Sequence, residues 1–372
     1  MPVPLVDLSW QHRVVAGEVE AGWAEVVSSS AFVGGAAVGA FERKFAGFSS
    51  TSSCVSVASG TDALELALRA VGVGTGDSVV VPVNTFVATA EAAARVGAIP
   101  RFVDCEPVHG LMDQEQACSA IPGARAVVPV HLYGQIAPLD AIVAGAASQG
   151  CAIVEDAAHA HGATRNGHGI GSWGRAAATS FYPSKNLGAY GDAGAVLTND
   201  DGVAAAVESL RDHNAIAVDG RTTAGVNSRM DTLQAVVLRA KLARLHEWNE
   251  LRAAAALRYG ELLGDLAAEG RLELPSALAG NQHVWHLYVV RVAHRDAVVS
   301  DLARAGITTG VHYAVPLHEE PAFAALGHPR GSFPVAEQLA GRIMSLPMFP
   351  GITCAQQERV VQAVEDSLRS HR

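Results

Sequence analysis

Two kinds of hydrophobic pattern alternate through the first half of the chain. Short apolar runs bounded by glycine, proline or polar residues predict buried strands at 79–83, 101–104, 125–131, 151–155 and 176–182. Longer stretches of good helix formers that end near a glycine predict helices at 63–70, 87–96 and 139–148, the first of them capped by Thr61 or Asp62. Strands that alternate with helices of this length form crossover units. The pattern therefore predicts an α/β fold with a mostly parallel sheet between helices.

The last third of the chain follows a different pattern. One helical stripe runs from 230 to about 266, which at ~1.5 Å per residue could extend about 50 Å and lead from one domain into another. Strands are expected at 284–292 and 307–312, a helix at 297–304, and a final helix that opens with a capping box from Thr353 to Gln356. A length of 372 residues suggests about two domains. We therefore expect a large α/β domain at 1–245 and a smaller α+β domain at 246–372.

Composition and charge exclude several classes of function. Hydrophobic residues make up 49% of the chain, and the net charge is −10 without a basic block, so a nucleic-acid partner is not expected. No segment approaches the ~18 consecutive apolar residues of a membrane span, and the first residues lack a signal-peptide pattern, so a cytoplasmic protein is expected. The five cysteines are widely spaced, and His159 and His161 lack companion ligands, so neither a disulfide framework nor a metal site is expected.

Polar and aromatic side chains follow several of the predicted strands. The carboxyl ends of parallel strands share one edge of a sheet, so residues 84–86, 132–135 and 156–159 should line one crevice. Lys185 follows the run 176–182, in a loop that also holds Gly188, Gly191 and Gly194. Most lysines in glycine-rich loops are solvated surface charges. A lysine near an apolar wall or another cation instead has a lowered pKa and is suited to imine chemistry.

The residues around Lys185 match the requirements of a lysine-bound pyridoxal phosphate (PLP). Asp156 ends a buried strand, where an isolated carboxylate is costly unless a cation such as a pyridinium pairs with it. Phe86, at another strand end, offers a flat apolar surface for the ring. Groups that suit a phosphate occur at one helix start and one strand end, at Gly60, Thr61 and Ser180.

At this point the chain resembles the DegT/StrS family of PLP-dependent sugar aminotransferases. The resemblance covers most of the chain and rests on S-G-T-D-A-L-E-L-A-L from residue 59, G-D-S-V-V-V-P-V-N-T-F-V-A-T from 76, V-P-V-H-L-Y-G-Q from 128, V-E-D-A-A-H-A-H-G-A from 154, S-F-Y-P-S-K-N-L-G from 180, N-S-R-M-D-T-L-Q-A from 227 and G-V-H-Y from 310. It implies the aspartate aminotransferase fold, fold type I. The predicted fold is thus a large domain with a mostly parallel sheet and a smaller C-terminal α+β domain.

The resemblance also implies roles for individual residues. Lys185 would be the Schiff-base lysine, and Asp156 the partner of the pyridine nitrogen. Phe86 would stack on the ring, while His159, where many members carry glutamine, would approach its phenolic oxygen. The implied phosphate ligands are Gly60, Thr61, Ser180 and, from the neighbouring subunit of a homodimer with shared active sites, Asn227.

Three positions depart from the family pattern. Ser184 stands where glycine is common before the lysine, Ala193 replaces one glycine of a usual pair, and Asn214 follows R-D-H where glycine is frequent. Asparagine tolerates left-handed backbone conformations better than most residues, so the last change can keep the local turn. Some members carry histidine in place of the lysine and catalyse dehydration. The retained Lys185 favours transamination.

The implied reaction moves an amino group from L-glutamate, or glutamine, to a nucleotide-linked keto-6-deoxyhexose, with dTDP as the expected nucleotide and C-3 or C-4 as the aminated carbon. An enzyme for small α-keto acids needs an arginine for each carboxylate. The loop 312–320 instead carries groups that suit sugar hydroxyls. We therefore predict that the sugar contacts His312, Tyr313 and His318. Arg229, beside Asn227, is expected to meet either the nucleotide diphosphate or the carboxylate of glutamate.

Other functions are compatible with parts of this pattern. The same motifs serve aminotransferases that act on keto-cyclitols in aminoglycoside-type pathways. A non-catalytic PLP-binding regulatory protein is a further alternative, which the intact Lys185, Asp156 and His159 disfavour. A cysteine desulfurase would need a reactive cysteine in a mobile glycine-rich loop, and no cysteine has that setting.

Overall fold

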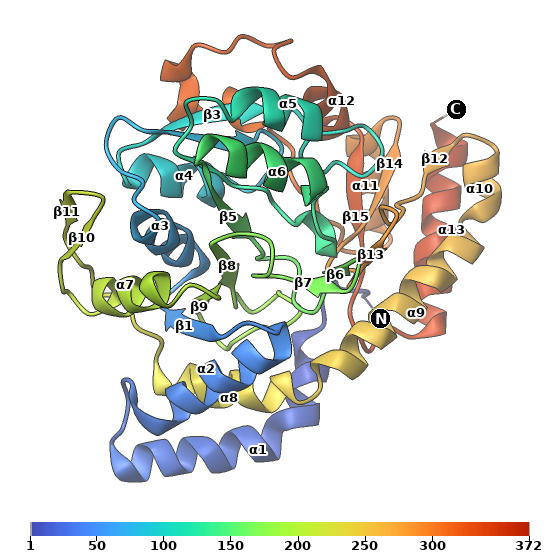
Figure 1. Ribbon diagram of the computed structural model, residues 1–372. Helices are drawn as coiled ribbons and strands as arrows, with labels where there is room; N and C mark the ends of the chain where they lie inside the picture. Colours follow the sequence, from blue (N-terminus) through green and yellow to red (C-terminus); the bar gives the residue numbers. More distant parts are fainter. Residues whose placement is uncertain (1, 372) are drawn as a thin grey trace.

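The computed structural model describes residues 2–371 and has a seven-stranded sheet, which lies at its centre (Figure 1). The strand order is β1-β9-β8-β5-β4-β2-β3, and only β9 runs against its neighbours, so the predicted mostly parallel sheet is confirmed. The strands are β1 (Ser53–Val57), β2 (Ser78–Pro82), β3 (Ile99–Val103), β4 (Ala126–Val127), β5 (Ala152–Asp156), β8 (Ala176–Ser180) and β9 (Gly194–Thr198).

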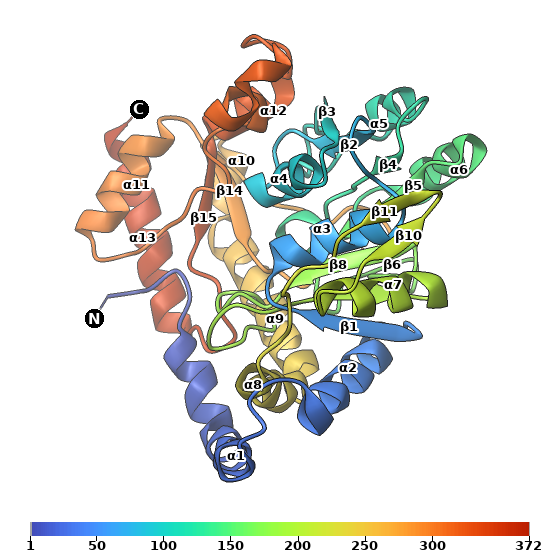
Figure 2. The ribbon, with the colours of Figure 1, turned by 90° about the vertical axis from the view of Figure 1, so that its left-hand side faces the viewer.

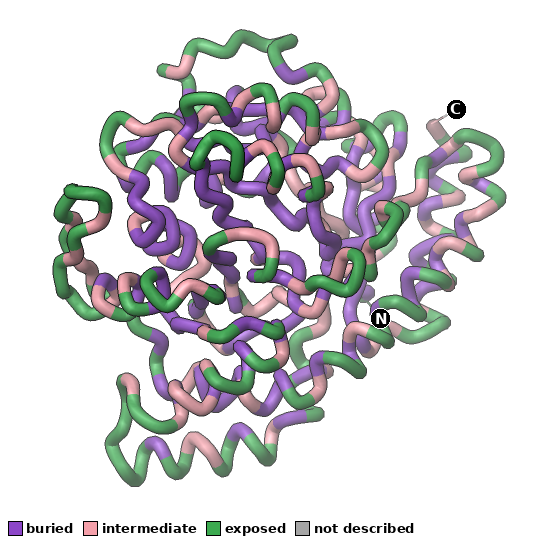
Figure 3. The backbone as a smooth tube through the Cα atoms, viewed as in Figure 1, coloured by how far each residue is buried: buried purple, intermediate pink, exposed green. Residues whose placement is uncertain are grey.

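Helices cover both faces of this sheet because its strands bury alternate side chains on opposite sides. Val79 and Val81 of β2 pack into one core, and Val80 between them packs into another. The first face is covered by α3 (Gly60–Ala70), α4 (Val87–Arg95) and α7 (Asp201–Arg211), and the second by α2 (Gly35–Ser49), α5 (Gln114–Ala120), α6 (Leu139–Gln149) and α8 (Thr232–Leu242). Figure 2 shows α3 and α7 directly against β8 and β1. Figure 3 shows that the strands and α3 are mostly buried, whereas α1 (Leu8–Ser29) has an exposed outer face.

The C-terminal part builds a second, antiparallel sheet in the order β12-β14-β15, from β12 (Leu272–Glu273), β14 (Tyr288–Val292) and β15 (Ile343–Leu346). Around it lie α9 (Leu245–Leu262), α10 (Gly264–Ala268), α11 (Arg295–Arg304), α12 (Pro334–Ala340) and α13 (Cys354–Ser370). The N-terminal arm joins this part, since Val3 forms a bridge with Ile307. The capping box of Thr353 and Gln356 is present at the start of α13. The division into domains at 245/246 stays a prediction.

Short elements complete the described chain. Two hairpin-like pieces are β10 (Ile216–Val218) with β11 (Arg221–Thr223), and β6 (Thr164–Arg165) with β7 (His168–Gly169) and β13 (Asn281–Gln282). Short 3-10 helices are η1 (Leu132–Gly134), η2 (Leu317–Glu319) and η3 (Pro321–Leu326). None of the helices within residues 2–371 combines the length and apolar character that a membrane crossing requires.

The structure corrects five expectations. The strand expected at 125–131 is limited to Ala126–Val127, followed by an isolated bridge at Val130. The cap of α3 is Ser59, whose hydroxyl accepts from the Asp62 N–H, and not Thr61 or Asp62. The single helix expected at 230–266 is three helices, because the chain turns at Ala243 and Arg244 while the apolar stripe continues on both sides. A periodic pattern does not show such a change of axis. The strand expected at 284–292 begins only at Tyr288, and the segment 307–312 forms single bridges at Ile307 and Gly310 instead of a strand.

Candidate active site

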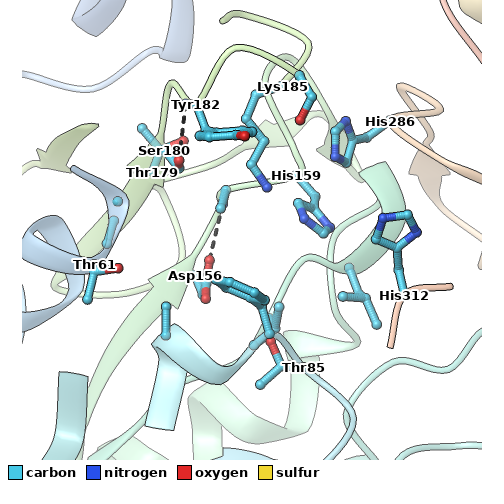
Figure 4. A pocket seen from close by; sticks show the side chains of 18 of the residues that line it. Thr61, Thr85, Asp156, His159, Thr179, Ser180, Tyr182, Lys185, His286 and His312 are labelled. Carbon is cyan, nitrogen blue, oxygen red and sulfur yellow. Dashed lines mark hydrogen bonds between the residues drawn. The ribbon is translucent and has the colours of Figure 1, made fainter. Parts of the chain in front are cut away.

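A cavity of about 350 Å³ lies at the carboxyl ends of the central strands, between the large sheet and the C-terminal part (Figure 4). Residues from all three predicted strand-end segments reach it, namely Thr85, Phe86, Leu132, Asp156, Ala158 and His159. The crevice expected from the sequence is therefore present. Other residues singled out in the sequence also line it, namely Gly60, Thr61, Ser180, Lys185, His312 and Tyr313.

Lys185 reaches the cavity from the loop that follows β8. Its backbone N–H donates to Tyr182 O at 2.9 Å, and the loop closes tightly enough that a Cβ on Gly188 would lie 2.2 Å from Pro183 O. Glycine is therefore required at that position. Figure 4 shows the Lys185 amine pointing into the cavity toward Asp156 and His159. Burial lowers the pKa of this amine to about 8, and the Asp156 charge acts in the opposite direction.

Asp156 is the last residue of β5, and its carboxylate is buried at the base of the cavity. The Thr89 hydroxyl donates to Oδ2 at 2.7 Å, and the Ala158 N–H donates to Oδ1 at 3.2 Å. Burial raises the pKa of this carboxyl, while these two hydrogen bonds and the Lys185 charge lower it. No residue between 2 and 371 forms a salt bridge with it. A cation placed in the cavity would therefore be stabilised there.

The other side of the cavity is the start of α3. Gly60 packs so closely against β8 that a Cβ at this position would lie 2.5 Å from the Ser180 Cβ. The first N–H groups of a helix lack partners within the helix, and the helix dipole favours an anion at this end. Thr61 and Ser180 add two hydroxyl groups beside them. The arrangement suits a phosphate.

Three buried histidines stand close to the lysine. The rings of His159 and His286 have centroids 4.4 Å apart, and burial together with neighbouring positive groups lowers the pKa of both imidazoles well below the usual value. His161 stabilises the loop that carries Lys185, since the Leu187 N–H donates to His161 Nδ1 at 3.2 Å. Burial lowers the pKa of His161 to about 3. These side chains are therefore neutral hydrogen-bonding groups at ordinary pH.

His312 and Tyr313 form the wall contributed by the C-terminal part. His312 Nδ1 lies 2.8 Å from the Ser345 hydroxyl, and burial lowers the pKa of this imidazole to about 4. The Tyr313 ring lies against Phe86, with centroids 5.4 Å apart, and its hydroxyl is 3.5 Å from His159 Nε2. The two parts of the chain thus meet directly at the cavity.

The structure does not bring Asn227, Arg229 or His318 to this cavity. Arg229 contacts Asn227 and forms an ion pair with Asp212 at 3.1 Å, with 40% of its side chain exposed. His318 is buried elsewhere, with Nε2 3.0 Å from Glu337 Oε1. Its sequence neighbours His312 and Tyr313 do line the cavity, but the chain turns away at η2.

Sequence reasoning missed several residues of the site. The cavity is also lined by Leu5, Val6, Ser59, Tyr182, Ser184, Asp192 and His286. Tyr182 and Ser184 lie within the motif around the lysine, so their place in that motif could have identified them as residues of the site. His286 fell inside an expected strand, and Leu5 and Val6 belong to an arm without a distinctive pattern. Thr89, which donates to Asp156, is the last residue of the motif that begins at 76, but its alanine-rich helix gave no chemical reason to single it out.

One group of potential metal ligands lies outside the cavity. Ligand atoms of His318, Glu319 and Glu337 are within 4.8 Å of one another. The Glu337 carboxylate already accepts from the N–H groups of Gly331 and Phe333, and Arg330 lies 3.7 Å from Glu319. Both carboxylates therefore already have partners within the protein, and their positions do not require a bound metal ion.

Comparison with known proteins places this geometry in a family. The family model for DegT/DnrJ/EryC1/StrS aminotransferases matches residues 16–365. One similar protein is the erythromycin biosynthesis sensory transduction protein EryC1 of Saccharopolyspora erythraea, 42% identical over 98% of this chain and 99% of its own. Another is the dTDP-3-amino-3,4,6-trideoxy-alpha-D-glucose transaminase of Streptomyces venezuelae, 42% identical over 98% of this chain and 96% of its own.

A solved structure agrees with the fold. DesV of S. venezuelae, in complex with a ketimine intermediate, has a TM-score of 0.93 and 41% identity over 99% of this chain and 98% of its own. The fold is therefore that of PLP-dependent sugar aminotransferases, fold type I, as the sequence predicted.

PLP is the cofactor of these enzymes, and the cavity residues fit it in three respects. Lys185 presents a buried amine with a lowered pKa and without a hydrogen-bond acceptor among the described residues. The Asp156 carboxylate lacks a bonded cation, which a protonated pyridine would supply. The start of α3, with Gly60 pressed against Ser180, offers the place for the phosphate.

Proposed function

The chain belongs to the DegT/DnrJ/EryC1/StrS aminotransferase family, and we propose that it transfers the amino group of L-glutamate to C-3 of a dTDP-linked keto-6-deoxyhexose. The choice of C-3 and of dTDP is supported by the name of the similar S. venezuelae transaminase. The observation that carries the proposal is the lining of the cavity. It holds a reactive lysine and a buried carboxylate, yet no arginine is among its described lining residues. An enzyme whose donor and acceptor are both dicarboxylates would need arginines within the cavity itself, whereas a sugar acceptor needs none, and the carboxylate of glutamate could meet Arg229 of the partner subunit.

Lys185 is the residue that accepts and returns the proton. With a pKa of about 8, about a tenth of its amine is neutral at pH 7, far more than for an ordinary lysine, so it can act both as nucleophile and as base. A bound PLP supplies an aldehyde for the amine and a ring that draws electrons away from the carbon that loses a proton. The loop fixes Lys185 by its backbone, which leaves the side chain free to move between these roles.

Asp156 maintains the charge that this chemistry requires. Its two hydrogen-bond donors, Thr89 and Ala158, favour the carboxylate, and burial strengthens its attraction for a cation. It would therefore keep a pyridine nitrogen protonated. Neutral His159 and Phe86 would orient the ring from its edge and its face.

The acceptor sugar would lie against the outer part of the cavity. His312, Tyr313 and Asp192 offer hydrogen-bonding groups there, and Leu5 and Val6 add an apolar surface. Such a mixture suits a deoxysugar, which has both hydroxyl groups and a methyl group.

We further infer a homodimer in which Asn227 and Arg229 serve the partner's site. Both lie outside the cavity of their own chain, and Arg229 is half-exposed. In a dimer they could contact the cofactor phosphate and either the sugar diphosphate or the glutamate carboxylate. Mixing Lys185→Ala chains with Asn227→Ala chains should restore part of the activity. A monomer with full activity would contradict this arrangement. The cytoplasmic location also stays a prediction.

A regulatory function without catalysis is the main alternative from another class, and the name of the relative EryC1 refers to sensory transduction. The presence of Lys185, Asp156 and an open cavity favours catalysis. An acceptor of the keto-cyclitol type would use the same lysine, and no feature of the described chain favours it over a nucleotide sugar.

One experiment tests the proposal and its rivals. The purified protein with PLP and glutamate is incubated separately with dTDP-linked 3-keto and 4-keto deoxyhexoses, the free sugars, a keto-cyclitol and pyruvate, and amino products are measured by mass spectrometry. We expect fastest turnover with the 3-keto nucleotide sugar. Pyruvate as the best acceptor would refute the sugar assignment, and no turnover with any acceptor would favour the regulatory alternative.

A further inference from the structure

Tyr133 has an unusual backbone conformation at the edge of the cavity. It lies in η1, between β4 and α6, with φ 61° and ψ −5°. Residues other than glycine, asparagine and aspartate seldom adopt this left-handed backbone conformation, which is strained for a bulky residue. Such strain persists only where the surrounding structure holds it. The contacts of Tyr133 show what holds it here.

Three hydrogen bonds link Tyr133 to both walls of the cavity. Its backbone N–H donates to His159 Nδ1 at 3.3 Å. Its carbonyl accepts from the Leu287 N–H at 3.1 Å, and its hydroxyl donates to His312 O at 2.6 Å. His159 follows a strand of the large sheet, whereas Leu287 and His312 belong to the C-terminal part. One residue thus connects the cofactor side of the cavity with its outer side.

The left-handed turn brings the two parts into close contact. The next residue, Gly134, accepts from the Val284 N–H at 2.8 Å, and a Cβ on Gly134 would lie 2.7 Å from the His286 N. The chain therefore passes the backbone of 284–287 with no room for a side chain at Gly134. The conformation of Tyr133 directs its own N–H toward His159 at the same point.

The bond from Tyr133 determines which nitrogen of His159 carries a proton. An N–H donor requires a lone pair on Nδ1, so a neutral His159 carries its proton on Nε2. Nε2 is the atom that lies 3.5 Å from the Tyr313 hydroxyl. His159 would therefore present an N–H donor, and not an acceptor, to any oxygen opposite Nε2.

We propose that Tyr133 is a positioning residue with two functions: its N–H fixes His159 as the Nε2–H tautomer, and its hydroxyl holds the His312–Tyr313 segment at the distance that the acceptor requires. The second function rests on the proposed transfer to a keto sugar. The first concerns only the protein and does not depend on the identity of the acceptor.

Neutron diffraction tests the first function. Crystals of the PLP-loaded protein, exchanged into D₂O near neutral pD, should show deuterium on His159 Nε2 and none on Nδ1. Deuterium on Nδ1, either alone or together with Nε2, would overturn the assignment. The result does not depend on turnover, so it remains decisive if no acceptor is found.

Two matched tyrosine variants test the second function. Tyr133→Phe removes only the bond to His312 O. Tyr259→Phe is the control, because the Tyr259 hydroxyl also donates to a buried carbonyl, Pro347 O at 3.0 Å, but does not line the cavity. We expect Tyr133→Phe to raise KM for the keto sugar about fivefold to tenfold, the size of one hydrogen bond, with little change in kcat or in the absorbance of bound PLP. Tyr259→Phe should leave KM unchanged.

Hydrogen exchange provides a readout without substrate. Backbone amides in 310–315 should exchange faster in Tyr133→Phe than in the wild type, and at the wild-type rate in Tyr259→Phe. Equal exchange and equal KM in the two variants would overturn the proposed function of the hydroxyl. If the wild type turns over no keto sugar, the proposed acceptor is wrong, and the exchange data alone decide whether Tyr133 holds this segment.

Discussion

Two lysines with desolvated amines, half-buried Lys185 and fully buried Lys241, have similarly lowered pKa values but different surroundings. Burial lowers the pKa of each amine to about 8. Lys241, in α8, donates to Gly188 O at 2.6 Å and lies 4.5 Å from the centre of the Tyr190 ring. Lys185 has no hydrogen-bond acceptor for its amine among residues 2–371, and it points into the cavity.

The comparison distinguishes a lysine that stabilises the fold from a lysine that is available to react. A lowered pKa alone does not identify a catalytic lysine, because both amines have a pKa of about 8. What differs is the unused bonding capacity of the amine and its access to open space. The two are also connected in space, since Lys241 holds the carbonyl of Gly188, three positions after Lys185 in the same loop. The structural lysine thus supports the reactive one.

The largest expected effect distinguishes the two amines by covalent labelling. Borohydride reduction in the presence of PLP, followed by peptide mapping, should place the pyridoxyl group on Lys185 only. Lys185→Ala should lose at least ~10³ of the rate of amino transfer from glutamate, because both the nucleophile and the base are removed. A label on Lys241 or on Lys44 would refute the distinction.

The next effect concerns the charge that faces Lys185. Asp156→Asn keeps the shape of the side chain, so the protein should fold, but the rate should fall by about 10² or more because a charged stabiliser is lost. Thr89→Val is the matched smaller change, since it removes only the hydroxyl bond to Oδ2, and about a tenfold loss is expected. Single-turnover rates with glutamate measure both. Near-normal turnover in Asp156→Asn would contradict its proposed role.

Much of the fold was predictable because strand and helix periodicities are local. Parallel strands then bring their carboxyl ends together, so the positions of Asp156 and Phe86 at one cavity followed from topology. The turn at Ala243 was not predictable, because the apolar stripe continues through it. The contribution of Leu5, His286 and Thr89 depends on how distant segments pack, and their local sequence does not carry that information. The positions of His312 and Tyr313 at the cavity agree with the sequence analysis, and that of His318 does not.

A smaller effect should appear in the pH dependence of the reaction with PLP. Only the neutral amine of Lys185 reacts, so the rate at which the apoprotein attaches PLP should rise about tenfold per pH unit well below pH 8 and level off above it. Asp156 raises the pKa of Lys185, so Asp156→Asn should move the midpoint to lower pH. Stopped-flow absorbance measures both midpoints. A midpoint near 10.5 would mean that Lys185 is not desolvated.

The smallest effect is expected for Lys241, and it concerns stability instead of labelling. Lys241→Met keeps the length of the side chain but leaves Gly188 O without its donor. The free energy of unfolding, measured with denaturant, should therefore fall by about 1–3 kcal/mol. PLP should still attach to Lys185. The pKa of Lys241 is lower in the folded protein than its ordinary value of 10.5, so the unfolded chain binds more protons between about pH 8 and 10.5. The stability advantage of the wild type over Lys241→Met should therefore grow as pH rises through this range. Because Lys185 is present in both proteins, its own titration cancels. If the variant is as stable as the wild type at every pH, the hydrogen bond from Lys241 to Gly188 O does not stabilise the folded protein, and the proposed structural role of Lys241 is wrong.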